Sequence, residues 1–124
     1  MRVARDYDWK TGCDVEATLC VIGGRWKPVL LFHLLGGKQR FNALCRLTPN
    51  ATQRMITLQL RELEEDGVIT RRVYAEVPPR VEYELTERGR SLEPLLLQMR
   101  SWGEEFRKQA SGPTGPAEGD RMPA

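Results

Sequence analysis

Acidic residues are missing from a long stretch of this sequence. Between Glu16 and Glu62 there is no Asp or Glu, although the interval covers more than a third of the 124 residues. The same interval, called the basic interval below, contains these Lys and Arg residues: Arg25, Lys27, Lys38, Arg40, Arg46, Arg54 and Arg61. The whole chain has a net charge of only +2, so its basic character is local. Charge of one sign in one region predicts contact with a polyanion.

Long apolar runs are also absent. No segment approaches the ~18 consecutive apolar residues that can span a bilayer. The first ten residues lack the apolar core of a signal peptide. A hydrophobic content of 40% with 29% charged residues is typical of an ordinary globular domain. We therefore expect one compact domain in the cytoplasm, with no membrane partner.

Histidine and cysteine are scarce. The chain has one histidine, His33, and three cysteines, Cys13, Cys20 and Cys45, with no C-x-x-C spacing. This set does not supply the ligands of a usual Cys/His zinc site, and the sequence has no Ser-His-Asp set and no Gly-rich phosphate loop. We expect no enzyme, metal or cofactor, and thiols at Cys20 and Cys45 buried in the core. A cysteine enzyme pairing His33 with Cys13 or Cys45 is the formal alternative.

The first half of the chain has the spacing of three helices. Residues 13–22 have apolar side chains at helical spacing and end at two glycines. Residues 26–35 are apolar all round, which predicts a helix at the centre of the domain. Residues 41–47 indicate a brief helix that ends at Thr48-Pro49-Asn50.

Residues 52–66 form the clearest predicted helix. Ile56, Leu60 and Leu63 recur on one stripe, Thr52 suits the N-cap, and Gly67 suits the position after the last turn. The opposite face of the first three turns carries the following polar residues: Gln53, Arg54, Thr57 and Arg61. Acids begin only at Glu62, in turns where the helix dipole disfavours them. The N-terminal half therefore suits an anionic partner; the alternative is a surface helix with accidental polarity.

The order of these elements predicts the fold. A short helix, a turn and a longer helix with an exposed polar face make a helix-turn-helix. Residues 68–74 and 81–85 read as strands on either side of a proline-rich turn at 76–80, which is the pattern of a β-wing. The predicted class is α+β, mostly α: a winged helix-turn-helix.

A last helix is predicted from Thr86 to about Gln109, bent at most by Pro94 in an early turn. Its apolar stripe contains Leu95, Met99, Trp102 and Phe106. Such a stripe is too large to leave in water, so we expect a homodimer through it. Alternatively, the stripe covers the core of its own domain. The predicted organisation is an N-terminal arm at 1–12, a domain at 13–109 and a disordered tail at 110–124.

The segment from Cys13 to about Trp102 resembles the HxlR-type family of bacterial transcriptional regulators, winged-helix proteins related in fold to the MarR group. The resemblance rests on short words in a fixed order: Cys13-Asp-Val-Glu16, Ile22-Gly-Gly-Arg-Trp26, Arg54-Met-Ile-Thr57, Leu60-Arg-Glu-Leu-Glu64, Gly67-Val-Ile69, Val77-Pro-Pro-Arg-Val-Glu-Tyr83 and Leu85-Thr86. Ala51-Thr52 departs from the family, which more often shows Ile-Ser, but Thr keeps the cap hydroxyl. The resemblance implies a homodimer that binds an operator through the helix at 52–66 and a wing at 74–83, with dimerisation through the N- and C-terminal helices.

The residues themselves suggest how double-stranded DNA would be contacted. Gln53, Arg54 and Thr57 are candidates for base edges in the major groove, and Arg54 is favoured because Arg can bond guanine bidentately. The remaining candidates are expected at the DNA backbone or, for the last of them, at a neighbouring minor groove: Lys38, Arg40, Thr52, Arg61 and Arg80. Arg80 could instead pair with Glu76 or Glu82 in the wing. A dimer would read a pseudo-palindromic operator.

Regulation is the remaining question. Cys13 lies at the start of a helix, where the dipole favours the thiolate, and the resemblance implies that a Cys here senses oxidants or electrophiles in some members. The alternative is a structural Cys packed at the dimer seam. A small-molecule effector in a pocket near Trp26, His33 and the last helix is a further possibility, and it is compatible with DNA binding. The rival to the whole interpretation is a winged-helix protein-interaction module that never touches DNA.

Overall fold

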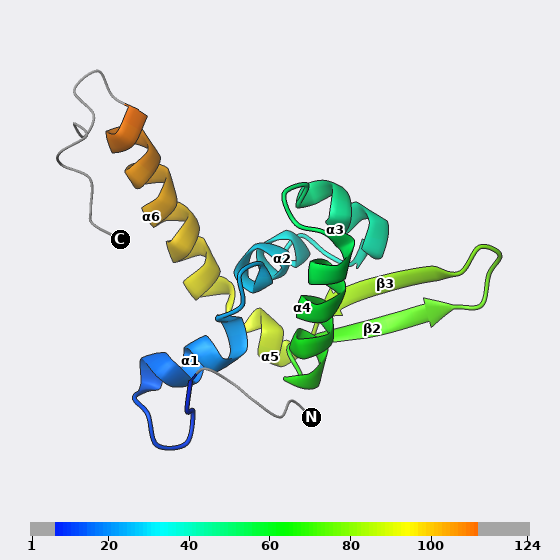
Figure 1. The fold of residues 1–124 in the computed structure, drawn as a ribbon, viewed down its shortest axis with the longest axis horizontal. Helices are drawn as coiled ribbons and strands as arrows, with labels where there is room; N and C mark the ends of the chain where they lie inside the picture. Colours follow the sequence, from blue (N-terminus) through cyan, green and yellow to red (C-terminus); the bar gives the residue numbers. More distant parts are fainter. Residues whose placement is uncertain (1–6, 112–124) are drawn as a thin grey trace. The chain divides into compact units, whose positions relative to one another are not determined.

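The computed structural model describes residues 7–111 and divides into two units between Glu93 and Pro94. The elements of the first unit, in chain order, are α1 (Asp14–Ile22), α2 (Lys27–Leu34), β1 (Gln39–Arg40), α3 (Phe41–Leu47), α4 (Gln53–Glu65), β2 (Ile69–Tyr74), β3 (Arg80–Leu85) and α5 (Glu87–Arg90). The described part of the second unit is the helix α6 (Glu93–Ser111) from Pro94 onward (Figure 1).

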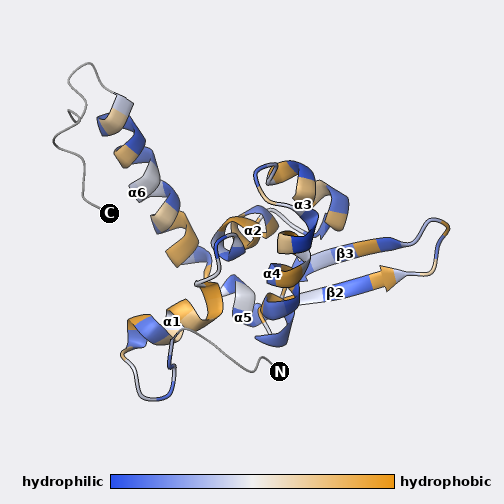
Figure 2. Cartoon of the chain, viewed as in Figure 1, coloured by the Kyte–Doolittle hydropathy of each residue, from blue (hydrophilic) through white to orange (hydrophobic). Residues whose placement is uncertain are grey.

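The core of the first unit forms where α2, α3 and α4 meet the sheet. α2 starts with Pro28 in its first turn and is mainly apolar (Figure 2), which fits its buried position. The stripe of α4 predicted to face inward is fully buried. The largest completely buried side chains are Leu30, Leu31, Leu34, Leu44, Ile56, Leu60, Leu63, Val68 and Ile69. The predicted central helix and the predicted inward stripe are both confirmed.

The sheet has the strand order β1-β3-β2, with both pairings antiparallel. β2 and β3 form the predicted wing, which extends beyond α3 and α4 in Figure 1, and Arg71 pairs in register with Tyr83. β1 was not predicted. Its two residues pair with Glu82 and Tyr83 of β3 immediately before α3 begins. The result is the expected winged helix-turn-helix, a mostly helical fold with a small sheet.

The single last helix predicted from Thr86 is wrong. The chain instead forms a short helix, α5, which the Thr86 hydroxyl caps by accepting a hydrogen bond from the Gly89 amide. α5 ends at Arg90, and α6 starts at Glu93 after two residues in a turn. Pro94 explains the break: it has no N–H to donate to the carbonyl of Arg90, so a continuous helix would lose that bond. Pro94 lies in the first turn of α6, where a proline is tolerated.

The ends of the chain limit what can be compared with the sequence. Residues 1–6 of the predicted N-terminal arm and residues 112–124 of the predicted disordered tail lie outside the described residues. Between residues 7 and 111, no helix is long and apolar enough to cross a membrane.

Candidate nucleic-acid interface

α4 is held at both ends. The Thr52 hydroxyl accepts a hydrogen bond from the Met55 amide at 3.1 Å, which satisfies one of the free N–H groups of the first turn. Gly67 follows the helix with φ +76°, a conformation that favours glycine. Nη1 of Arg88 on α5 donates to the carbonyl of Asp66 at 3.2 Å. A cation from another helix thus compensates for the acids in the last turns of α4.

The outward face of α4 has the polarity that the sequence predicts. Gln53, Arg54, Thr57 and Arg61 are all exposed, and the first turn contains no acid. Leu58 lies among them and is 43% exposed. α4 therefore presents Arg, Gln and Thr side chains and one apolar side chain to a partner, over a helix length that fits the major groove of B-DNA.

The inner face of α4 is fixed to the start of α2 and to the turn before it. Nζ of Lys27 lies 2.6 Å from Oε1 of Glu62, and the lysine side chain is only 3% exposed. The Gln59 side chain accepts a hydrogen bond from the Trp26 amide at 3.1 Å and lies directly against Gly24, where a Cβ would overlap its carboxamide. Counting Lys27 with the basic surface was therefore wrong, because it is buried in an ion pair that orients α4.

The rest of the basic interval does reach the surface. The exposed basic residues are Arg25, Lys38, Arg40, Arg46, Arg54 and Arg61. Lys38 precedes β1, and Arg40 is both the end of β1 and the N-cap residue of α3. The short β1–β3 pairing therefore positions two of the predicted backbone contacts beside the wing.

Arg80 is paired within the wing, as the alternative interpretation held. Its Nη2 lies 3.1 Å from a carboxylate oxygen of Glu76, and its Nε lies 3.6 Å from one of Glu82. The guanidinium also lies over the ring of Tyr74, with Cζ 3.9 Å from the ring centroid. These contacts tie the turn of the wing to both strands.

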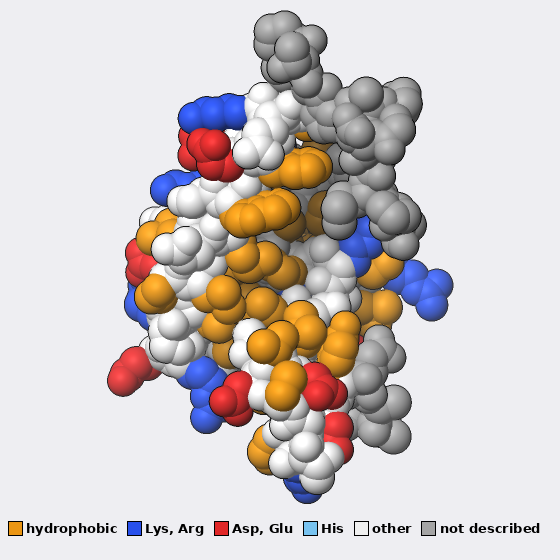
Figure 3. Space-filling view, turned by 90° about the vertical axis from the view of Figure 1, so that its left-hand side faces the viewer, with side chains coloured by type: hydrophobic (Ala, Val, Ile, Leu, Met, Phe, Trp, Pro, Cys, Tyr) orange, Lys and Arg blue, Asp and Glu red, His pale blue; other side chains and the backbone are white. Residues whose placement is uncertain are grey.

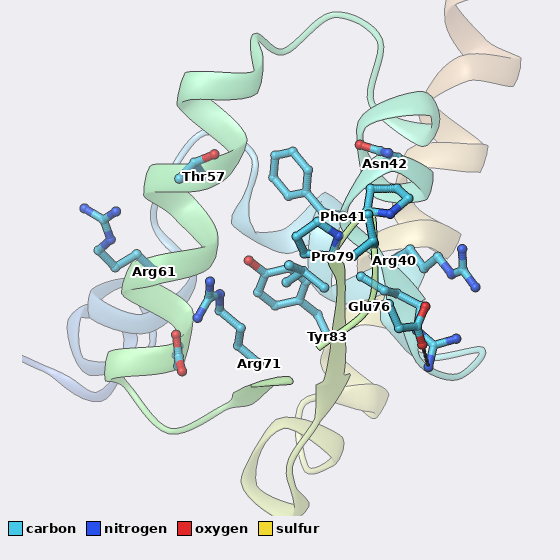
Figure 4. A pocket seen from close by; sticks show the side chains of 14 residues that line it. Arg40, Phe41, Asn42, Thr57, Arg61, Arg71, Glu76, Pro79 and Tyr83 are labelled. Atoms are coloured by element: carbon cyan, nitrogen blue, oxygen red, sulfur yellow. Dashed lines mark ion pairs between the residues drawn. The ribbon is translucent and has the colours of Figure 1, made fainter. Parts of the chain in front are cut away.

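A groove of about 690 Å³ separates α4 from the wing. It is lined by Arg40, Phe41, Asn42, Thr57, Arg61, Glu64, Arg71, Glu76, Val77, Pro78, Pro79, Arg80, Val81 and Tyr83. Figure 4 shows Arg61 on α4, Arg71 beside the Tyr83 hydroxyl, and Arg40 on the opposite wall. Two residues of this lining, Arg71 and Tyr83, were not predicted as site residues from the sequence. Strand alternation could have found them, because residues on one face of the wing recur at every second position.

The three cysteines have different surroundings. Cys13 is exposed and is the N-cap residue of α1, where its amide donates to the Glu16 carboxylate at 3.0 Å. Cys20 is buried, as predicted, and its thiol donates to the carbonyl of Tyr7 at 3.0 Å. Cys45 is only half-buried, which is less than predicted, and this burial raises the pKa of its thiol.

α6 carries the predicted apolar stripe. Leu95, Met99, Trp102 and Phe106 are all exposed, and Trp102 is 71% exposed. The rings of Trp102 and Phe106 stack with their centroids 5.6 Å apart and their planes within 10°. Figure 3 shows hydrophobic side chains gathered along the helix, and Figure 2 shows apolar segments of α6 alternating with polar ones. An exposed stripe of this size is typical of a helix that packs against a partner.

Comparisons with known proteins agree with this geometry. The profile of the HxlR-like helix-turn-helix family matches residues 21–111. YybR of Bacillus subtilis strain 168, an uncharacterized HTH-type transcriptional regulator, is 60% identical over 101 residues, covering 82% of this chain and 81% of YybR. The redox regulator HypR has been solved in oxidized and reduced forms. The oxidized form is 61% identical with a TM-score of 0.72, covering 75% of this chain and 96% of that chain. The reduced form is 60% identical with a TM-score of 0.73, covering 77% and 94%. The chain belongs to the HxlR-like helix-turn-helix family of transcriptional regulators.

Proposed function

We propose that this chain regulates transcription by binding a pseudo-palindromic DNA operator as a homodimer, with α4 in the major groove. The observation that carries the proposal is the outward face of α4. It exposes Gln53, Arg54, Thr57 and Arg61 without an acid in the first turn, on a helix fixed to the core by Lys27. A preorganised helix with these side chains can address base edges without reordering.

The roles divide by position on α4 and beside it. Arg54, Gln53 and Thr57 lie in the first half of the helix and are proposed to read bases. Arg61 lies two turns further on and is assigned to the DNA backbone. The N-terminus of α4, at Thr52, offers backbone N–H groups to a phosphate. Lys38 and Arg40 are proposed to contact the backbone from the β1 side.

Dimerisation is proposed through α6. The exposed stripe of Leu95, Met99, Trp102 and Phe106 is isologous in a two-fold dimer, so each copy would cover the other. Two copies of α4 would then lie about one turn of DNA apart, ~34 Å, and read two half-sites.

An oxidant response through Cys13 is proposed as a second layer. Cys13 is exposed at the N-cap of α1, and the redox regulator HypR, which has a similar fold, has been solved in an oxidized and a reduced form. In this proposal a thiol oxidant such as diamide takes two hydrogens, from Cys13 and a second thiol. A disulfide forms and diamide is reduced to the hydrazine. The alternative is that Cys13 packs at the dimer seam.

The test begins by selecting bound fragments from genomic DNA with the purified full chain. Competition titrations then compare two variants on the selected operator. Arg54→Ala should lose about 1–3 kcal/mol of discrimination at one base position, whereas Arg40→Ala should weaken all sequences similarly. The base-reading assignment fails if Arg54→Ala keeps full operator selectivity.

A winged-helix module that binds only proteins is the rival, and salt distinguishes the two. DNA binding should weaken with a log–log slope near −0.9 per phosphate contacted. Absence of salt-dependent duplex binding by the wild-type chain would remove the proposed function.

A further inference from the structure

The wing has two different faces. Residues of β2 and β3 alternate, so Arg71, Val73, Val81 and Tyr83 share the face toward α4, while Thr70, Arg72, Tyr74, Glu82 and Glu84 share the other. The groove beside α4 contains Arg71 and Tyr83 but not Arg72. A smaller hollow of about 90 Å³ on the far face contains Arg72 with Lys38, Glu82 and Glu84. Arg71 and Arg72, which are neighbours on β2, therefore lie on opposite faces of the wing.

Arg71 and Tyr83 form the floor of the groove. They are partners across the β2–β3 register, and the Arg71 side chain hydrogen-bonds the Tyr83 hydroxyl. Tyr83 is only 6% exposed, whereas Arg71 is exposed. In Figure 4 the Arg71 guanidinium lies between the Tyr83 ring and α4. The Tyr83 hydroxyl thus positions the Arg71 guanidinium, which still has N–H donors available to a ligand.

The charges in the groove favour an anion. Arg80 is already paired with Glu76, which leaves Arg40, Arg61 and Arg71 against one acid, Glu64. Arg61 and Glu64 both lie close enough to Tyr83 to influence its ionisation. Burial raises the pKa of the Tyr83 hydroxyl, so this group keeps its proton at neutral pH and carries no competing negative charge.

We infer that the groove between α4 and the wing binds a phosphodiester of the DNA backbone, with Arg71 on its floor as the principal ligand and Arg61 on its α4 wall as the second. The inference rests on the proposed function and adds a contact to the DNA backbone that does not depend on the base sequence. When α4 occupies a major groove, a strand of the duplex borders that groove, and the cleft beside the helix is where its phosphates pass. The planar fork of an arginine fits phosphate oxygens bidentately.

Arg71→Gln is the test, and Arg72→Gln is its matched control. Both remove one positive charge from adjacent positions of the same strand, but only Arg71 faces the groove. The probe is a mixed-sequence duplex, because a phosphate contact does not need the operator. In fluorescence anisotropy titrations across a salt series, Arg71→Gln should reduce the log–log slope by about 0.9, the value for one phosphate. Arg72→Gln should change the slope by less than half as much.

Two further variants separate charge from geometry. Arg71→Lys should keep the slope of the wild type but bind the duplex more weakly, because Lys keeps the charge and loses the fork. Tyr83→Phe should keep the fold and weaken duplex binding, since it removes the hydroxyl that positions Arg71. Thermal unfolding of each variant shows whether it is folded.

The outcomes distinguish this inference from the proposed function. If the wild-type chain binds duplex DNA with a salt-dependent affinity, but Arg71→Gln keeps the wild-type slope or changes it no more than Arg72→Gln, the phosphate site is wrong and DNA binding stands. If the wild-type chain does not bind the duplex, the proposed function itself fails. On the selected operator, one neutral methylphosphonate linkage should weaken binding of the wild type but not of Arg71→Gln.

Discussion

The ammonium group of Lys27 at the start of α2 lies 2.6 Å from the carboxylate of Glu62 on α4, and the two partners differ in exposure. The lysine side chain is 3% exposed and the glutamate side chain 33%. The cost of losing each partner should differ accordingly, because a buried charge without its counterion is expensive and a charge near water is not.

We expect Glu62→Gln to lower the free energy of unfolding by about 3 kcal/mol, since it leaves the Lys27 ammonium buried without its carboxylate. Lys27→Met should cost less, because it removes the buried charge and the apolar stem can still pack. Urea denaturation of both variants measures the difference. Equal losses, or a larger loss for Lys27→Met, would contradict this account of the pair.

The cap of α4 gives a second stability prediction. Thr52→Ala removes the hydroxyl that accepts from the Met55 amide and should cost about 1 kcal/mol. Thr52→Ser keeps an acceptor and serves as the control. Denaturation without DNA isolates the cap from any phosphate contact, and a Ser variant as unstable as the Ala variant would show that the hydroxyl is not what matters.

Self-association should depend on the apolar stripe of α6. Trp102→Ala or Phe106→Ala removes a large exposed ring, and loss of a central anchor typically costs roughly 2 kcal/mol, or a roughly 30-fold weaker dimer. Gln98→Ala on the same helix is the control. Sedimentation equilibrium gives the dimer constant. A wild-type chain that stays monomeric at every concentration would remove the dimer from the proposal.

Stability should fall at acid pH through His33. Burial lowers the pKa of His33, and a hydrogen bond to the Leu47 backbone opposes this only in part. The unfolded chain therefore takes up its proton first, near pH 6.5, and the folded chain does so only at lower pH. The contribution of neutral His33 to the free energy of unfolding is therefore fully present above pH 6.5, and it is lost as the pH falls through the folded-state pKa of His33. His33→Gln should have a flatter profile of unfolding free energy between pH 7.5 and pH 5; an unchanged profile would contradict it.

Oxidant response tests the role of Cys13. In the proposal, diamide changes operator binding of the wild-type chain, and Cys13→Ser removes the change while leaving reduced binding intact. Cys20→Ser is a poor control because Cys20 is buried. Cys45→Ser therefore serves as the control instead. Gel-shift titrations with and without diamide supply the measurement. An unchanged diamide response in Cys13→Ser would show that Cys13 is not the sensing thiol and would favour a structural role for it.

Local chemistry explains why much of the fold was predictable. The bounds of α4 follow from its cap and from the glycine after it, and its buried stripe follows from periodicity. The wing follows from two β-type runs around Pro78 and Pro79. β1 could not be found in the same way, because a two-residue strand has no period and exists only through pairing with β3. The break before α6 could have been predicted by giving Pro94 more weight.

The face of α4 that carries the candidate site was predictable from the sequence, but the side chains that pair with one another were not. The exposed side chains of α4 follow from counting around a helix. Whether a cation is free or paired depends on residues distant in sequence, as for Lys27 with Glu62. The Arg71–Tyr83 floor needs the strand register, which the sequence fixes only through the wing turn.

Gly24 meets no part of the proposed DNA surface, yet the lack of a side chain there leaves room for the Gln59 carboxamide to hold the Trp26 amide. A methyl group at this position would displace that carboxamide and release one of the contacts that aim α4. A random-mutagenesis screen for altered operator preference is therefore expected to recover substitutions at Gly24, on the side of α4 opposite its DNA-facing residues. Operator specificity in this chain then depends partly on the backbone of a turn. Transferring the outward residues of α4 alone to a relative would therefore transfer that specificity only in part.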